Sequence, residues 1–291
     1  MNQPVPATTP TSVPPLPPST LGFKTLLEGP GGTGKTYSIG TLIDSGLEVF
    51  YLGIGEAGGM EALLGYYLDR GLPLPPNFHH SRVEFPSVGF DEMLKTAKLI
   101  NSLTYDALTK MTDSDRSKHN QFIQPFSALN NFTDQNGKSF GPVDKWGPDK
   151  ALVVDSLTGI GAAAMSLVVG GKPVKSQPDW QIAMDQVEKL LKKLTDGCKC
   201  HFILISHIDR ETDEVTGGTK IMTGTLGRKL APKLPPMFSD VIMSVRTGTQ
   251  FSWSTASAQA DLKARNLPIA DGLKPDFQQI VSKWKSRLGI Q

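Results

Sequence analysis

Short apolar runs, separated by stretches of helical character, organise the chain from about residue 21 onward. Runs of four to seven residues that end in polar or glycine positions are typical of strands buried on both faces. The runs that predict such strands are residues 23–27, 48–54, 82–85, 151–155 and 201–206. Two further runs, at 240–245 and 250–255, follow each other closely and predict a strand-rich end to the pattern.

The stretches between these runs predict helices at 35–45, 90–102, 159–169, 178–195 and 275–288. In the fourth of these, apolar residues recur on one helical face, namely Trp180, Met184, Val187, Leu190, Leu191 and Leu194. Strands that alternate with helices predict an α/β fold with a mostly parallel central sheet and helices on both faces. The runs that begin at Asp240 predict an antiparallel strand extension of this sheet.

Composition suggests where the domain begins. Residues 1–20 contain seven prolines among Thr and Ser, and such a segment cannot bury enough apolar surface to offset the entropy of ordering. We therefore expect a disordered or polyproline tail at 1–20 and one α/β domain over 21–291. Residues 105–150 are polar and irregular in pattern, which predicts an insertion in this domain.

Charge and composition narrow the class of protein. The 291 residues contain 30 Lys and Arg against 28 Asp and Glu, a net charge of +2, so a dedicated nucleic-acid coat is excluded and any nucleic-acid contact must be local. No apolar run approaches the ~20 residues that cross a bilayer, and the first residues lack the pattern of a secretory signal. Cys198 and Cys200, the two cysteines, cannot form a disulfide framework. We therefore expect a cytoplasmic protein with no membrane partner.

The strongest chemical signal lies at residues 29–36. They are Gly29, Pro30, Gly31, Gly32, Thr33, Gly34, Lys35 and Thr36, a full match to the phosphate-binding pattern G-x-x-x-x-G-K-[ST]. Glycines let the backbone curl so that its N–H groups point at phosphate oxygens, and the following helix presents its positive end to the same anion. We expect Lys35 to bind the β- and γ-phosphates of ATP and the Thr36 hydroxyl to bind Mg²⁺.

Two carboxylates are candidates to complete the chemistry of an ATP site. Asp155 ends the predicted strand at 151–155, where an acid can hold the Mg²⁺ shell. Glu56 follows the strand at 48–54 and is a candidate for the general base that orients the attacking water. Glu61 is the rival for this role, and the alternative for Glu56 is a loop carboxylate that caps the next helix.

Together these motifs resemble the core of the RecA-like P-loop ATPases. In that family the catalytic Glu follows the strand after the phosphate-loop helix, which is the place of Glu56. The strand after the Mg²⁺-binding acid ends in a polar residue that senses the γ-phosphate, and His207 follows Ser206 at the corresponding place. The resemblance also implies that the Gly-rich loop at 209–228 contacts DNA. Its first half carries acids, whereas the stretch from Lys220 to Lys233 carries cations only.

The segment from Asp261 to Asn266 points to one group within these ATPases. It looks like the Lys-x-Arg element of DnaB-type helicases, KaiC and RadA-type proteins, which one subunit inserts into the ATP site of its neighbour. Lys263 and Arg265 match the two cations, and a solvated surface pair is the alternative. Over residues 21–270 the order of motifs is similar to short phage-encoded RecA-like ATPases linked to single-strand annealing and recombination.

This resemblance implies a phage-type recombination ATPase that hydrolyses ATP with Mg²⁺ between subunits of a homo-oligomeric ring or filament. It also implies single-stranded DNA as a partner, with a single-strand DNA-binding protein as a further one. Two other functions stay open on the residues alone. One is a small-molecule or nucleotide kinase, which needs a lid of arginines. The other is an assembly or loader protein that uses ATP only to oligomerise.

Overall fold

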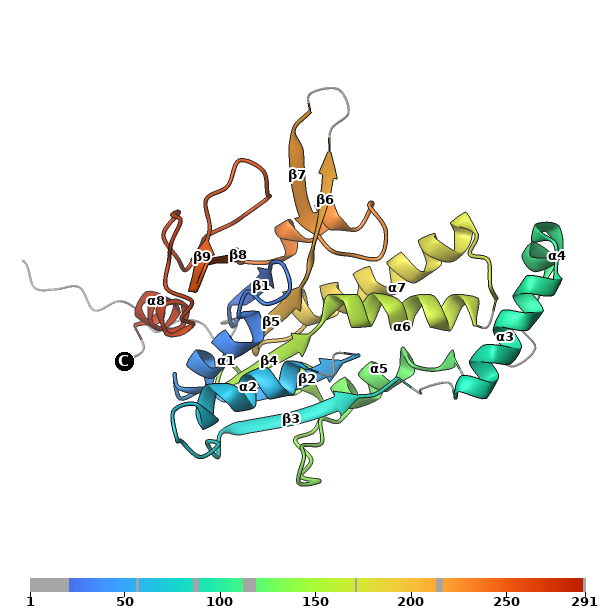
Figure 1. Ribbon diagram of the computed structural model, residues 1–291. Helices are drawn as coiled ribbons and strands as arrows, with labels where there is room; N and C mark the ends of the chain where they lie inside the picture. Colours follow the sequence, from blue (N-terminus) through green and yellow to red (C-terminus); the bar gives the residue numbers. More distant parts are fainter. Residues whose placement is uncertain are drawn as a thin grey trace, which may run out of the picture.

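A seven-stranded sheet forms the centre of the computed structural model, which describes residues 21–55, 58–85, 89–111, 119–170, 172–212 and 217–289 (Figure 1). Its strand order is β3-β2-β4-β5-β1-β8-β9, and every neighbouring pair is parallel except β8 and β9. The strands are β1 (Lys24–Glu28), β2 (Glu48–Ile54), β3 (Phe78–Val83), β4 (Lys150–Asp155), β5 (His201–Ser206), β8 (Asp240–Thr247) and β9 (Gln250–Ser254). The expected α/β fold, with a mostly parallel central sheet, helices on both faces and an antiparallel extension, is therefore confirmed.

Helices cover both faces of this sheet. They are α1 (Lys35–Ile43), α2 (Gly59–Leu68), α3 (Phe90–Ser102), α4 (Tyr105–Lys110), α5 (Ile123–Asn130), α6 (Leu157–Val169), α7 (Gln177–Asp196) and α8 (Gln278–Leu288), with 3₁₀ turns η2 (Val143–Lys145), η3 (Ala231–Lys233) and η4 (Pro235–Met237). The hydrophobic core on one face includes α1, α2 and α8, and the core on the other includes α6 and α7. Helix α3 has no buried residue and lies beyond the ends of α6 and α7 in Figure 1. Within the described ranges, none of the helices is both long enough and apolar enough to span a bilayer.

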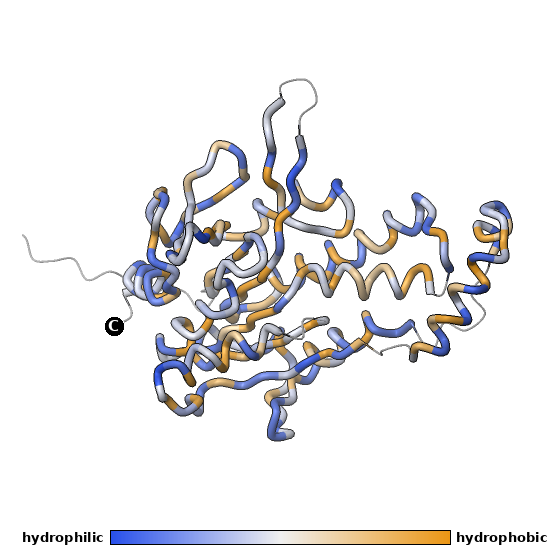
Figure 2. The backbone as a smooth tube through the Cα atoms, viewed as in Figure 1, coloured by the Kyte–Doolittle hydropathy of each residue, from blue (hydrophilic) through white to orange (hydrophobic). Residues whose placement is uncertain are grey.

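Alternation along each strand decides which core a side chain joins. In β2, Phe50 and Leu52 belong to the core with α6 and α7, whereas Val49 and Tyr51 belong to the core with α1 and α2. Because successive side chains of a strand point to opposite faces, a strand covered on both faces must be apolar at nearly every position. This accounts for the unbroken apolar runs in the sequence, and Figure 2 shows hydrophobic colour along the central strands and α6.

Residues 105–150, expected to be polar and irregular, contain regular structure and core side chains. The helices α4 and α5 and the turn η2 lie in this range. Phe132 and Trp146 are buried, and their ring centroids lie 5.2 and 4.2 Å from that of Phe50 on β2. These aromatic residues follow neither a helical nor a strand period, so the sequence pattern does not reveal their burial.

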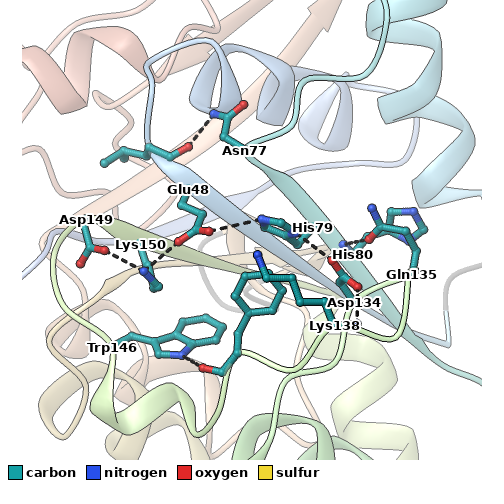
Figure 3. Close-up of polar contacts among 12 residues, drawn as sticks. Glu48, Asn77, His79, His80, Asp134, Gln135, Lys138, Trp146, Asp149 and Lys150 are labelled. Atoms are coloured by element: carbon teal, nitrogen blue, oxygen red, sulfur yellow. Dashed lines mark hydrogen bonds and ion pairs between the residues drawn. The ribbon is translucent and has the colours of Figure 1, made fainter.

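A polar network fastens the same range to the edge of the sheet (Figure 3). His79 of β3 lies between two carboxylates, with Nδ1 3.0 Å from Asp134 and Nε2 3.4 Å from Glu48. Glu48 also pairs with the Lys150 ammonium at 2.7 Å. Burial alone would raise the pKa of Asp134, but hydrogen bonds from the Lys138 amide and His79 outweigh it and lower this pKa. The network therefore favours an ionised Asp134 that holds the segment against β3.

Several elements differ from the sequence-based expectation; for example, α1 ends at Ile43 rather than at residue 45, and α6 begins at Leu157 rather than at residue 159. The third strand is Phe78–Val83 rather than 82–85, because an edge strand that pairs only with β2 tolerates the polar residues between. The last helix begins at Gln278 rather than at residue 275. Residues 209–228 are not simply a loop, since most of the antiparallel hairpin of β6 (Ile208–Thr212) and β7 (Thr219–Thr223) lies in this range, and the hairpin projects from the sheet (Figure 1). Its strand residues are mostly polar, and most are exposed or half-buried, so no apolar run in the sequence indicates these strands.

Replacing Phe132 by Ala tests whether the segment around it is part of the core. Phe132 is fully buried at 0% exposure, so Phe132→Ala should lower the free energy of unfolding by about 3–5 kcal/mol through lost contacts and a residual cavity. Urea unfolding followed by circular dichroism measures this change. Phe126→Ala is the matched control, because Phe126 is 41% exposed and should cost much less. Equal losses in the two variants would contradict a core role for Phe132.

Candidate nucleotide-binding site

Glycines shape the turn between β1 and α1. Gly32 and Gly34 have φ angles of +73° and +79°, a region that residues with a Cβ rarely adopt. At Gly29 a Cβ would lie 2.5 Å from the carbonyl oxygen of Ser244 on β8. The Ser244 hydroxyl also donates a hydrogen bond to the Thr33 carbonyl at 2.8 Å. The loop is therefore curled and held against β8, as a phosphate-binding backbone requires.

Lys35 and the amino end of α1 converge on the mouth of this loop. Lys35 is buried, and its Nζ donates to the carbonyl oxygens of Gly29 and Pro30 at 2.8 and 2.7 Å. Gly34 is the N-cap residue of α1 and has no side chain that could occupy the first-turn N–H groups. An ammonium and a set of backbone N–H groups that point to one place form a site for an anion.

Thr36 and Asp155 meet beside the loop. The hydroxyls of Thr36 and Tyr51 each donate to Asp155 Oδ2 at 2.8 Å. Asp155 is the last residue of β4 and is buried. A hydroxyl oxygen and a carboxylate oxygen are ligands that suit Mg²⁺, which completes its shell with water and phosphate oxygens. The residues present therefore fit a Mg²⁺ site next to a bound phosphate.

A cavity of about 890 Å³ opens at the loop and is large enough for a nucleoside triphosphate. Tyr37, Tyr66 and Arg70 form part of its wall. The ring centroids of Tyr37 and Tyr66 are 5.1 Å apart, and the Arg70 guanidinium carbon lies 3.6 Å from the centroid of the Tyr66 ring. Flat aromatic and guanidinium surfaces suit stacking against a planar base.

Sequence reasoning did not single out these wall residues or Tyr51. Tyr51 lies inside an apolar run and has the pattern of a core residue. Tyr66 and Arg70 are four positions apart, a spacing that brings two side chains together on one helical face. This spacing next to a phosphate-binding motif is the one signal that could have pointed to them.

His207 lines the cavity, as expected for the residue after β5. Its backbone carbonyl accepts hydrogen bonds from the Gly224 amide at 2.8 Å and from the Ser206 hydroxyl at 2.9 Å. The fold therefore brings His207 to the same cavity as Lys35 and Asp155.

Of the two candidates for the general base, the structure describes only Glu61. Glu56 lies outside the described residues, and Gly58 and Gly59 just after it line the cavity. Glu61 lies in the first turn of α2 with an exposed side chain, and it is not among the described residues that line the cavity. The role of Glu56 as general base therefore stays a prediction.

Lys263 and Arg265 are not among the described residues that line the cavity of their own chain. Lys263 pairs with Val241 near the start of β8, and its Nζ donates to the Phe238 carbonyl at 2.7 Å. The Asp240 carboxylate accepts from the Arg265 amide at 2.8 Å, and the Arg265 side chain is exposed. Since β8 runs parallel to β1, these residues lie toward the amino ends of the strands, whereas the phosphate loop follows a carboxyl end.

A buried carboxylate that the sequence pattern does not reveal lies directly before the loop. Glu28, the last residue of β1, is 2% exposed and accepts a hydrogen bond from the Thr223 hydroxyl at 2.7 Å. Burial raises the pKa of Glu28 to about 7, while the Thr223 hydrogen bond lowers it and the negative charge of Asp261 raises it. In the sequence it has the pattern of an ordinary polar end to an apolar run.

Comparison with known proteins gives similarity to solved structures alone, since no family model and no curated protein matches the chain. One similar structure is a prototypical ATPase from the type III secretion system of pathogenic bacteria, with 13% identity and a TM-score of 0.39 over 78% of this chain and 53% of that chain. Another is the ATPase EscN in complex with its central stalk EscO from enteropathogenic E. coli, with 11% identity and a TM-score of 0.37 over 78% of this chain and 42% of that chain. This chain thus spans about half of the secretion ATPases that it matches, and both likenesses are too low to imply a shared activity.

Replacing Glu28 by Gln tests the buried charge. The ordinary pKa of 4.5 rises to about 7 in the folded protein, so the folded state holds this proton more tightly than the unfolded state. The stability of the wild type should therefore fall as pH rises from about 4.5 to 7 and level off above, by at most about 3 kcal/mol. Gln cannot ionise, so the Tm of Glu28→Gln relative to the wild type should increase between pH ~5 and ~8, as calorimetry would show. A constant difference would contradict the raised pKa.

Proposed function

We propose that this chain is a Mg²⁺-dependent ATPase of phage recombination type, which assembles into a homo-oligomer and engages single-stranded DNA. The observation that carries the ATPase proposal is the glycine loop at the mouth of an 890 Å³ cavity, with Thr36 hydrogen-bonded to Asp155 at 2.8 Å beside it. The resemblance to RecA-like ATPases of annealing and recombination supports the choice of DNA as partner.

A triphosphate accounts for the loop, the ammonium and the carboxylate together. Lys35 now donates to two loop carbonyls, and it can exchange these neutral acceptors for phosphate oxygens, which accept stronger hydrogen bonds. Thr36 and Asp155 would hold Mg²⁺, which supplies positive charge next to the phosphate oxygens. The nucleobase of the bound triphosphate would stack on the Tyr37 and Tyr66 rings, which form flat parts of the cavity wall.

Hydrolysis needs further groups around the γ-phosphate. In our proposal Glu56 orients the attacking water as general base and His207 contacts the γ-phosphate or this water. Lys263 and Arg265 of a neighbouring copy would stabilise the charge that develops in the transition state. Within one chain, Lys263 and Arg265 lie toward the amino ends of β1 and β8, away from the phosphate loop. The cations at each ATP site would therefore come from a neighbouring copy.

The β6–β7 hairpin is the proposed contact with single-stranded DNA. It begins directly after His207 and carries exposed Arg210 on β6 and Lys220 on β7. Lys220 pairs with Asp261 at 3.5 Å, and Arg228 pairs with Glu211 at 2.7 Å. Exposed ion pairs contribute little stability, so DNA phosphates can compete for these cations. Acidic side chains near the cations of 220–233 would repel DNA phosphates. We therefore expect the affinity for single-stranded DNA to be modest rather than high.

Lys35→Ala and Glu56→Gln separate binding from hydrolysis. Lys35→Ala should weaken binding of a fluorescent ATP analogue about tenfold or more, because a hydrogen bond from a charged group is worth ~1.5–3 kcal/mol. Glu56→Gln should bind the analogue like the wild type but lose about 100-fold in steady-state turnover. Lys138→Ala, which removes an exposed cation outside the cavity and the hairpin, is the control for charge loss. If Lys35→Ala bound the analogue and hydrolysed ATP like the wild type, the proposed ATP site would be wrong. If the wild type bound the analogue but did not hydrolyse ATP, an assembly role would be favoured.

Fluorescence anisotropy with a labelled single-stranded oligonucleotide tests the DNA contact. Affinity should rise with a non-hydrolysable ATP analogue and fall with salt, since bound cations release counterions from the strand. Lys220→Ala should lower the slope of log affinity against log salt by about 1. Lys138→Ala is the control, because Lys138 is exposed on the segment that packs beside β3. Equal affinity with and without the analogue would count against a nucleotide-controlled DNA contact.

A further inference from the structure

The β6–β7 hairpin joins the central sheet at a buried polar junction. Gly224, just after β7, donates its amide to the His207 carbonyl at 2.8 Å. The Ser206 hydroxyl lies within hydrogen-bond distance of the carbonyls of His207 and Gly224, at 2.9 and 3.2 Å. Ser206 is fully buried and pairs in register with Glu28 across β5 and β1. The end of the strand before the phosphate loop and the base of the hairpin therefore share one junction.

Glu28 and Thr223 make a side-chain contact across this junction. They are 195 residues apart in sequence, and the Thr223 hydroxyl donates to Glu28 Oε2 at 2.7 Å. Their exposures are 2% and 4%, so water does not compete for the bond, and a buried carboxylate needs the donor that Thr223 supplies. Lys220 and Asp261, which pair with each other at 3.5 Å, line the same small pocket. A displacement of Glu28 therefore alters its hydrogen bond with Thr223 directly.

Glu28 is also the residue before Gly29, where the phosphate loop begins. The Gly29 carbonyl accepts the hydrogen bond from Lys35 Nζ at 2.8 Å. A phosphate that recruits the Lys35 ammonium changes the hydrogen bonding of this carbonyl, one residue away from Glu28. At the same position a Cβ would lie 2.5 Å from the Ser244 carbonyl oxygen, so the backbone has little room to absorb the change on that side.

We propose that Glu28 is a positioning residue that transmits nucleotide binding from the phosphate loop to the β6–β7 hairpin through its hydrogen bond with Thr223. This inference rests on the proposed ATP site and adds a route from that site to the hairpin. The amide of Ile221 on β7 donates to the Gln259 carbonyl at 2.8 Å. This hydrogen bond does not involve β1. It can therefore hold β7 in place whether or not a nucleotide occupies the phosphate loop.

Hydrogen–deuterium exchange on the full chain, with and without a non-hydrolysable ATP analogue and Mg²⁺, tests the proposal without DNA. In the wild type, the analogue should slow exchange of the hairpin amides about fivefold or more, within the usual range of coupling between two sites. Thr223→Val removes the donor at nearly constant volume and should abolish this effect, while affinity for the analogue stays within about threefold of the wild type. Thr223→Ala is a second variant without the hydroxyl, should valine impair folding.

Three matched variants separate the hydrogen bond from general damage. Thr223→Ser restores a hydroxyl donor and Glu28→Gln keeps an acceptor, so both should retain the nucleotide effect on the hairpin. Thr219→Val changes a threonine at the other end of β7, which pairs with Thr212, and should behave like the wild type. A nucleotide effect that persists in folded Thr223→Val or Thr223→Ala would overturn the proposal, as would its loss in all variants alike.

The same measurements keep this inference distinct from the proposed function. If nucleotide binding protects the hairpin in the wild type but not in Thr223→Val, and the wild type does not bind single-stranded DNA, the route through Glu28 is supported and the DNA partner is overturned. A wild type that binds the analogue without any change in hairpin exchange overturns the route and leaves the ATP site standing. Failure to bind the analogue at all overturns both.

Discussion

The hydrogen bond between Thr36 and Asp155 joins two segments that are 119 residues apart, and the candidate site depends on it. Parallel strands carry all their carboxyl ends to one edge of a sheet, where ligands bind in open α/β folds. The order of β1, β5 and β4 along the sheet brings the phosphate loop, His207 and Asp155 to one cavity. The chemistry thus follows from topology, because none of these groups is near the others in sequence.

Strand β1 buries an ionisable side chain at each end, Lys24 and Glu28, and each has its own hydrogen-bonding partners. Burial lowers the pKa of Lys24, whose ammonium donates to the carbonyls of Cys198 and Cys200 at 2.8 and 2.6 Å. Glu28 has a hydroxyl donor, Thr223, and its pKa is raised to about 7. A buried charge is tolerated only with hydrogen-bonding partners, so both ends of the strand that carries the loop are tied to other parts of the chain.

The sequence was sufficient for the parts of the site that lie in consecutive positions and for strands covered on both faces. The glycine loop needs particular residues in a fixed order, and β2 needs apolar residues throughout, so each has a pattern of its own. The partners of Asp155 and Glu28 have none, because Tyr51 and Thr223 meet them only after strands far apart in sequence are placed side by side. The β6–β7 hairpin contains no apolar run, and the aromatic residues of 105–150 follow neither a helical nor a strand period, so the sequence pattern revealed neither of them.

Under the proposed function, the position of Lys263 and Arg265 also constrains how copies assemble. The Asp240 carboxylate accepts from the Arg265 amide at 2.8 Å, so the backbone is anchored while the side chain is exposed. A neighbouring copy that uses this side chain would contact it through the carboxyl ends of its own strands, where its phosphate loop lies. Such a contact joins two different surfaces and is therefore heterologous, so repetition builds a closed ring or an open filament rather than an isolated twofold dimer. Each internal copy then both receives cations at its own loop and supplies them to the next, which makes hydrolysis a property of the assembly.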